Sequence, residues 1–274
     1  MKTLADFKVQ RIGNTPVSVS DWGIFVHTFQ IDSPFASSDS ENLPGRHGSI
    51  GLGSTLRKRT MRAECTMVAQ DHYDYELLRN EIFKLFRADK PFYIIRDAEP
   101  GKRWLINEMS LYAPTREQKR GKFTLEFISY SPFSHSIGTT QDPLTFESEL
   151  WQFGQGLLLD DMIYNHTSTN FQIYNAGNET VNPRDMDLII EYTGASNNLS
   201  IKNITTGDEW IYTGSSNAGD SIKLEGIQST KNNLSILRNT NKKLISLDTG
   251  WNDFILTGTS GSFEIKFDFR FYYL

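Results

Sequence analysis

The segment that comes nearest to a known chemical motif is GSIGLGST, from Gly48 to Thr55. It has the glycines and the Ser-Thr of the phosphate-binding loop G-x-x-x-x-G-K-[ST], but Ser54 replaces the lysine that contacts the phosphates. A phosphate loop also leads into a helix whose N-terminus completes the anion site. Here the following TLRKRTMRAECTMVA alternates like a strand. We therefore expect a glycine-rich hairpin or bent strand with no nucleotide site, which argues against a nucleotide-dependent enzyme.

Other catalytic or metal-binding patterns are equally incomplete. The five histidines show no H-E-x-x-H spacing, and no G-x-S-x-G elbow occurs. His72 lies among Asp71, Asp74 and Glu76, which could bind a cation, although capping of a helix start explains these acids better. The single cysteine, Cys65, lies on the apolar face of an expected strand, where a buried, inert thiol is typical. We predict no enzyme, no cofactor and no metal site.

Two clusters of basic residues are candidates for a binding surface. The cluster KRGK from Lys119 to Lys122 has the pattern of an exposed hairpin tip. The other follows the glycine segment directly, and a DNA-binding groove there would need stacking aromatics and a strongly basic domain. Residues 1–140 carry 19 Lys and Arg against 16 Asp and Glu, and this net charge of +3 is too weak for tight nucleic-acid binding. Contacts with other protein subunits are the better prediction, and the candidate residues are Arg46, His47, Arg57, Arg59 and Arg62.

Three aromatic residues could contact a sugar. Trp210 with Tyr212, and Trp251, could form a stacking platform for a glycan. Aromatic residues two apart on a strand more often belong to a hydrophobic core. Both interpretations stay open at the level of the sequence.

Most of the chain is patterned as β-strands. Met61, Ala63, Cys65 and Met67 alternate with polar residues, and alternating apolar residues recur in segments 123–127 and 263–271. One helix is expected at about 72–89, where the apolar stripe consists of Leu77, Leu78, Ile82, Leu85 and Phe86. No apolar run approaches the ~20 residues that span a bilayer. The N-terminal sequence has no apolar segment typical of a secretory signal.

The chain is expected to form two domains. The stretch PFSHSIGTTQDP, from Pro132 to Pro143, lacks any period and is rich in Ser, Thr, Gly and Pro. We place an N-terminal domain at 1–135, a junction at 136–144 and a C-terminal domain at 145–274. Basic residues slightly exceed acidic ones in the first half, and acidic ones clearly exceed basic ones in the second. Short strands between polar turns favour a β-sandwich for the C-terminal domain.

The segments LPGRHGSIGLGSTLRKRTMRAECTMV, DLIIEYTGASNNLSIKNITTGDEWIY and LDTGWNDFILTG, with the final aromatic strand, resemble the distal tail proteins of long-tailed bacteriophages. The resemblance covers nearly the whole chain, and the N-x-TTG turn from Asn203 to Gly207 is its most specific part. It implies a mainly β protein with one α-helix. The N-terminal domain would be a β-sandwich-like, ring-forming domain, and the C-terminal domain a galectin-like β-sandwich.

The same resemblance implies a structural role. It predicts a homo-hexameric ring at the distal tip or baseplate of the virion tail, made in the host cytoplasm and without membrane insertion. The expected partners are the tail tube protein, a tail-tip or tail-associated protein and receptor-binding proteins. DNA would pass through the channel as cargo only. The alternative is a carbohydrate-binding adhesion module that contacts the host surface, in which Trp210, Tyr212 and Trp251 would face a glycan.

Overall fold

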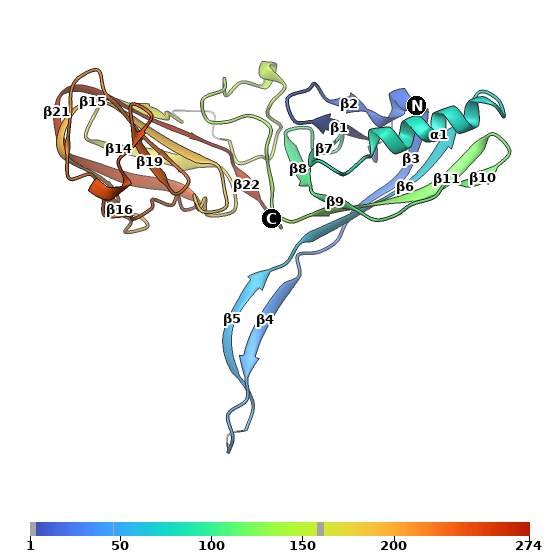
Figure 1. Ribbon diagram of the computed structural model, residues 1–274, viewed down its shortest axis with the longest axis horizontal. Coiled ribbons are helices and arrows are strands. Elements are labelled where there is room, and N and C mark those ends of the chain that lie inside the picture. Colours follow the sequence, from blue (N-terminus) through green and yellow to red (C-terminus); the bar gives the residue numbers. More distant parts are fainter. Residues whose placement is uncertain (1–3, 46, 158–161) are drawn as a thin grey trace. The chain divides into compact units, whose positions relative to one another are not determined.

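The computed structural model describes residues 4–45, 47–157 and 162–274. Contacts divide the chain into two compact units, one comprising Met1–Ser134 with Leu274 and the other His135–Tyr273 (Figure 1). Both units consist mainly of strands, and the described residues contain one α-helix, as the sequence predicted. No helix within these ranges is long and apolar enough to cross a membrane.

Unit 1 contains two sheets, one hairpin that pairs only with itself, and the helix. In one sheet the strands follow the order β2-β1-β7-β8, and in the other β10-β11-β6-β3, with β9 also paired to β11. The elements are β1 (Phe7–Arg11), β2 (Val17–Ser18), the 3-10 helix η1 (Val19–Trp22), β3 (Ile24–Ile31), β4 (Ala36–Glu41), β5 (Ile50–Leu56), β6 (Arg59–Val68), α1 (Asp74–Leu85), β7 (Phe92–Arg96), β8 (Lys102–Ile106), β9 (Glu108–Met109), β10 (Thr115–Glu117) and β11 (Arg120–Ser129). The short β12 (Ser134–Ser136) lies at the boundary of the two units.

The core of unit 1 follows the period of two that its strands show in sequence. The apolar residues of β6 that the sequence placed on one face are all buried, as are Phe123, Leu125 and Phe127 of β11. Phe7 of β1 joins the two sheets, because its ring lies 5.2 Å from Phe29 of β3 and 5.7 Å from Phe127. These edge-to-face contacts stabilise the packing beyond the buried area alone.

Helix α1 is fixed at both ends by side chains. The Asp71 carboxylate accepts hydrogen bonds from the backbone N–H of Tyr73 at 2.8 Å and of Asp74 at 2.9 Å, which lowers the pKa of this carboxyl group. The Arg11 guanidinium of β1 donates to the Leu85 and Arg87 carbonyls at 2.8 and 2.6 Å, satisfying acceptors that a helix end leaves free. Of the three acids at the start of the helix, Asp71 therefore caps it as the sequence predicted, whereas Glu76 pairs with Arg79 and Arg116.

The buried stripe of α1 differs from the predicted one at one position. Ile82 and Phe86 are buried, but Leu77 is 66% exposed and Tyr75 is buried instead. A Cβ atom placed on Gly121 would lie 2.7 Å from the Tyr75 hydroxyl, so the tyrosine fills the space that this glycine leaves on β11. The helix turns Tyr75 toward the sheet because β11 offers that opening.

Unit 2 is built around two long paired strands, β15 and β21. The strand order across their sheet is β13-β21-β15-β18-β19-β20. In addition, β14 pairs with β21, and β16 and β17 pair with β15. The elements are η2 (Phe146–Ser148), β13 (Asn165–His166), β14 (Asn170–Asn175), β15 (Leu188–Asn203), β16 (Glu209–Ile211), β17 (Ser215–Ser216), β18 (Ser221–Glu225), β19 (Gln228–Lys231), β20 (Leu234–Ser235), η3 (Leu237–Asn239), β21 (Gly250–Phe269) and β22 (Tyr272–Tyr273).

Each long strand serves two groups of neighbours because it bends midway. The β15–β21 register shifts between Gly194 and Ala195 and again between Ser196 and Ser200. Before the shifts β15 pairs with β18, and after them with β16. Gly258 lies at the bend of β21 with φ +82°, and a Cβ there would lie 2.4 Å from the Asn198 carbonyl oxygen. Only glycine fits this position without moving the facing backbone.

The last long strand has the predicted apolar face. Ile265, Phe267, Phe269 and Phe271 are fully buried, while the alternate positions carry charged side chains. Phe267 lies 4.9 Å from Phe254 of the same strand in an edge-to-face contact, so the two halves of β21 meet across the core. The bend thus lets one strand contribute to both sides of a single hydrophobic core.

The motifs that carry the sequence resemblance form a buried polar network. Asn203 of the N-x-TTG turn and Asn252 of the TGWND segment are both fully buried. The Asn203 amide donates to the Asn252 side-chain oxygen at 3.0 Å and to the Ser246 carbonyl at 2.8 Å. Asn252 donates in turn to the Asp248 carbonyl at 2.8 Å. These hydrogen bonds connect the two turns inside unit 2. They also satisfy the side-chain amides, which would otherwise be buried without partners.

Substitution of Gly258 tests the bend. We expect Gly258→Ala to lower the free energy of unfolding by about 2–4 kcal/mol, since the new Cβ meets facing backbone and the left-handed φ is strained. The matched control is Gly219→Ala, because a Cβ at Gly219 meets nothing within 4 Å. Denaturant unfolding followed by tryptophan fluorescence measures both. Equal stability of the two variants would contradict this account of the bend.

Candidate functional site

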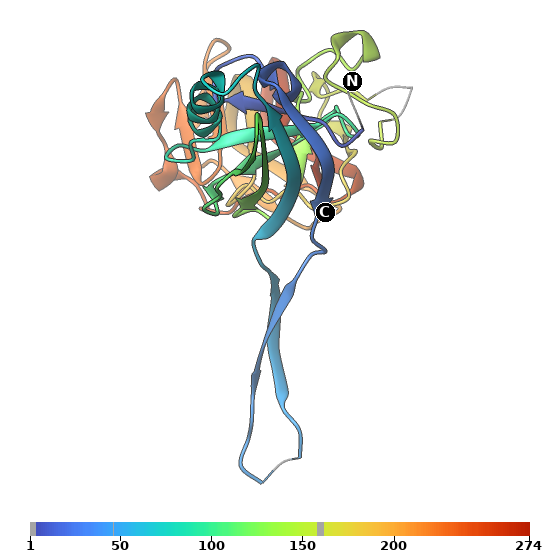
Figure 2. The same ribbon diagram turned by 90° about the vertical axis from the view of Figure 1, so that its right-hand side faces the viewer.

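Residues 35–57 form an extended hairpin, called the arm below, in which Arg46 lies outside the described residues. Its strands β4 and β5 pair with each other from Ala36–Leu56 to Glu41–Ile50, and neither pairs with any other strand. The arm continues directly from β3 and β6 of the core sheet (Figures 1 and 2). The Asp32 N–H donates to the Thr60 carbonyl where β3 and β6 leave the sheet, and the Arg57 N–H donates to the Phe35 carbonyl at the root of the arm.

The glycines of the arm shape its backbone. Gly45, Gly48 and Gly53 have φ of +82°, +81° and +141°, which other residues rarely adopt. The register shifts between Asp39 and Ser40, so Leu52 opposes no residue and is flanked by Gly51 and Gly53. The phosphate-loop-like segment runs into strand β5 and not into a helix, which agrees with the hairpin expected from the sequence.

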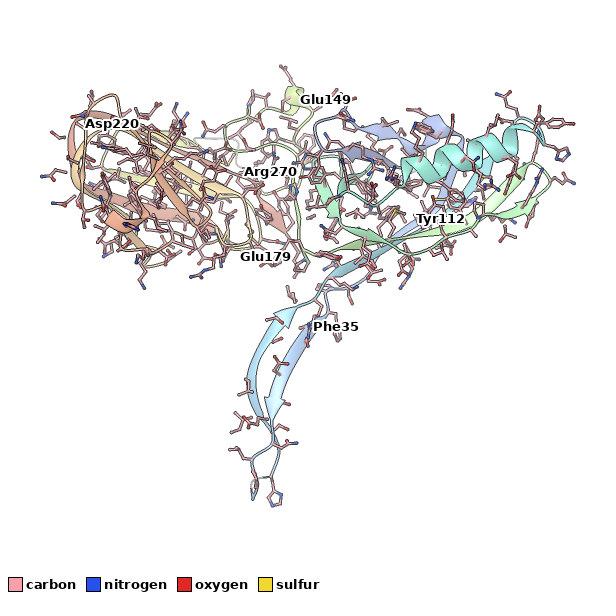
Figure 3. The ribbon with its side chains drawn as sticks, viewed as in Figure 1. Phe35, Tyr112, Glu149, Glu179, Asp220 and Arg270 are labelled. Carbon is pink, nitrogen blue, oxygen red and sulfur yellow. The ribbon has the colours of Figure 1, made fainter. Side chains whose placement is uncertain are left out.

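The arm exposes apolar side chains that it cannot bury by itself. Leu52 is 64% exposed, and Phe35, Leu43 and Leu56 are exposed as well. Figure 3 labels Phe35 at the root of the arm. A two-stranded hairpin is marginally stable in water when nothing packs on it. The arm therefore has the properties of a segment that packs against another surface.

Two of the predicted contact residues already have partners in their own chain. Arg57 is exposed and donates to the Ser37 hydroxyl at 2.8 Å across the arm. Arg62 of β6 pairs with Glu126 at 3.0 Å and with Asp32 at 3.3 Å. The hydrogen bond from Arg62 lowers the pKa of the Glu126 carboxyl group. His47 lies exposed in the turn between β4 and β5.

Arg59, at the start of β6, has a different environment. Its side chain is only 8% exposed, and its guanidinium lies 5.6 Å above the Trp104 ring of β8. Its Nε and Nη1 atoms are buried and have no hydrogen-bond partner among the described residues. Burial lowers the pKa of this guanidinium, and the nearby Asp32 opposes that effect. A buried cation with free donors is costly, and an incoming carboxylate would satisfy it.

The three aromatic residues of the glycan hypothesis do not lie on one surface. Trp210 is 1% exposed and donates to the Ser229 hydroxyl at 3.2 Å, and Tyr212 is buried beside it. Trp251 is partly exposed and lies 4.9 Å from the Tyr174 ring. Trp210 and Tyr212 thus take the core role that the sequence analysis weighed against the sugar platform.

The described residues offer little for catalysis. Burial raises the pKa of the Cys65 thiol to about 12, so it stays protonated and unreactive at neutral pH. Within residues 4–45, 47–157 and 162–274, no group of three His, Cys, Asp or Glu side chains could hold a metal ion.

A second surface of unit 1 was not anticipated from the sequence. A cavity of about 440 Å³ lies between the end of α1 and the segment after β9, and it is called the α1–β9 groove below. It is lined by Phe83, Phe86, Ala88, Met109, Ser110, Leu111 and Tyr112. Tyr112, labelled in Figure 3, lies 5.5 Å from Phe83 and 5.7 Å from Phe123. No local sequence pattern indicates this groove, because its residues meet only through tertiary packing.

Residues 17–129, from β2 to the end of β11, match the family model of the phage tail protein RIFT-related domain. A comparison with the curated proteins found no match.

Solved structures extend the likeness to the whole chain. The crystal structure of SPP1 Dit (gp 19.1), described as a paradigm of hub adsorption apparatus in Gram-positive infecting phages, matches with a TM-score of 0.70 and 12% identity, over 97% of this chain and 99% of that one. A chain of the phage p2 baseplate in its activated conformation with Sr matches with a TM-score of 0.47 and 8% identity, over 97% of both chains. The match to SPP1 Dit confirms the resemblance to distal tail proteins at the level of the fold.

Replacing Arg59 tests whether its charge is unsatisfied in the isolated subunit. We expect Arg59→Met to raise the free energy of unfolding of the monomer by roughly 1–2 kcal/mol, because methionine keeps the apolar packing on Trp104 and removes an unpaired buried charge. Thermal unfolding at concentrations where light scattering reports a monomer measures the effect. Arg57→Met, at an exposed position, is the matched control and should change stability by less than about 0.5 kcal/mol. A destabilised Arg59→Met monomer would show that Arg59 is already satisfied.

Proposed function

We propose that the protein is a structural component of a phage tail, located at the distal end, where it forms a ring that joins the tail tube to the tail-tip proteins. The match of residues 17–129 to a phage tail domain and the fold shared with SPP1 Dit support a structural role in the tail. The ring, six-fold by family resemblance, is part of the proposal. The virion tail is the proposed location, after synthesis in the host cytoplasm.

The arm is the observation that carries the proposal. Its strands have no partner strand beyond each other, and Leu52 and Phe35 are exposed. At its root, Arg59 holds buried donors without an acceptor among the described residues. An adjacent subunit can supply both the apolar cover and a carboxylate. Each subunit would then give its arm to one neighbour and receive the arm of the other, which is a heterologous contact, and such contacts close into a ring when the rotation permits.

The proposed mechanism is geometric. A closed ring of identical contacts leaves a channel through which DNA passes, and it presents repeated surfaces to the tail tube protein and to tail-tip or receptor-binding proteins. No step requires a catalytic group or a bound cofactor. We propose unit 1 as the ring-forming domain and unit 2 as a galectin-like β-sandwich on the periphery.

Shortening the arm tests the ring. We expect replacement of Ser37–Thr55 by Asn-Gly to leave unit 1 folded, because a two-residue turn can join the paired Ala36 and Leu56. Native mass spectrometry should show the wild type as a closed oligomer and the shortened variant as a monomer. Ile227→Ser, which removes an exposed apolar side chain from unit 2, is the control and should assemble like the wild type.

Arg59→Met adds an independent measurement. If a neighbour's carboxylate pairs with Arg59, this variant should weaken the ring while it stabilises the monomer, and these opposite signs distinguish the pairing from a general packing defect. A shortened variant that folds and still forms the same oligomer would refute the role of the arm. A wild type that stays monomeric at high concentration would refute self-assembly into a ring.

A further inference from the structure

The α1–β9 groove is an apolar surface with an open rim. Leu111 on its edge is fully exposed, and Phe83 on the opposite side is 40% exposed. Exposed apolar residues that gather around a cavity mark an interaction surface more strongly than scattered ones do. Tyr112 holds the floor in place, since its hydroxyl donates to the Ile82 carbonyl at 3.4 Å and its ring packs on both α1 and β11.

A positive charge lies directly beside the groove. Lys84 follows Phe83 in the last turn of α1 and is exposed. It makes no ion pair with any residue that the structure describes. Arg87 and Lys90 are exposed just beyond the helix end, where Arg87 pairs with Asp89 at 2.8 Å. The end of α1 therefore offers Lys84 and Lys90 to an acidic partner beside the apolar opening.

The arm carries the complementary arrangement. Leu52 is the bulged residue between the pairs Asp39–Gly53 and Ser40–Gly51, so its backbone lies across from Asp39 and Ser40. Glycines on both sides of Leu52 let the backbone approach another surface closely. Asp39 and Glu41 are exposed, and neither forms an ion pair with a described residue. The arm thus presents an isolated leucine beside acidic groups.

We propose that the α1–β9 groove is the docking site for the arm of a second copy of this chain. The Leu52 side chain of the second copy packs against Leu111 and Phe83, and its Asp39 pairs with Lys84. This inference rests on the proposed ring and names the surface that receives each arm.

The arm is long enough to reach another subunit. From Arg59, where β6 begins in the core sheet, to Leu52 the chain spans roughly 23 Å at about 3.3 Å per residue. A globular unit the size of unit 1 has a radius of gyration of about 14 Å. The arm can therefore extend past its own unit and place Leu52 on an adjacent copy, while its root stays in the core sheet.

Disulfide trapping between two separately made variants tests the contact. Leu52→Cys protein and Leu111→Cys protein are mixed in equal amounts and oxidised with oxidised glutathione, so that a disulfide between positions 52 and 111 can form only between copies. The native Cys65 is 2% exposed and adds little background. We expect this disulfide at least about tenfold faster than in a control mixture with Leu77→Cys, because docking raises the local thiol concentration to the millimolar range. Leu77 is as exposed as Leu52 but lies outside the groove.

An exchange of charges between the two chains provides a second test of the contact. Lys84→Glu in the Leu111→Cys chain should slow the trapping, and Asp39→Lys in the Leu52→Cys chain should restore it. A wild-type ring in native mass spectrometry together with trapping no faster than the Leu77→Cys control would overturn the groove as docking site and leave the proposed ring intact. A monomeric wild type with no trapping would overturn both.

Discussion

The pairing of β6 with β3 on one side and β11 on the other is the constraint on which unit 1 depends. Because side chains alternate along a strand, this pairing directs Met61, Ala63, Cys65 and Met67 into the core as a set. A register slip by one residue would expose all four. The same strand leaves the core sheet and becomes the root of the arm, so the register that builds the core also fixes where the arm begins.

The transition from core to arm explains why Arg59 lies where it does. At Met61 the strand is paired with both β3 and β11, whereas Arg57 lies at the root of an exposed hairpin. Arg59 occupies the boundary, where its guanidinium lies over the Trp104 ring but its Nε and Nη1 atoms find no acceptor among the described residues. A cation at this point is poorly suited to an isolated subunit and well suited to a contact, which is why the proposed function gives it a partner.

Sequence patterns predicted the features that depend on local period and failed where tertiary contacts decide. The strand at 61–67 and the aromatic face of β21 follow from alternation alone. The helix was predictable, but its inward residue Tyr75 was not, because Gly121 creates the space for it from another strand. The glycines between Gly45 and Gly53 indicated a hairpin. The basic residues that follow them indicated contacts with other protein subunits. No local pattern predicts the burial of Arg59, since Trp104 comes near it only when the two sheets pack. The α1–β9 groove likewise forms only when the segment around Leu111 packs beside the helix.

The direct continuation of β3 and β6 into the arm has a mechanical consequence. Hydrogen bonds between antiparallel strands lie perpendicular to the strand direction. Tension applied along the arm therefore loads the whole β6–β11 ladder, from Arg59–Ser129 to Val68–Arg120, in shear and all at once. A hairpin attached through a flexible loop would instead tear away from its sheet one bond at a time. An arm rooted in this way can carry load without unfolding the unit from which it extends.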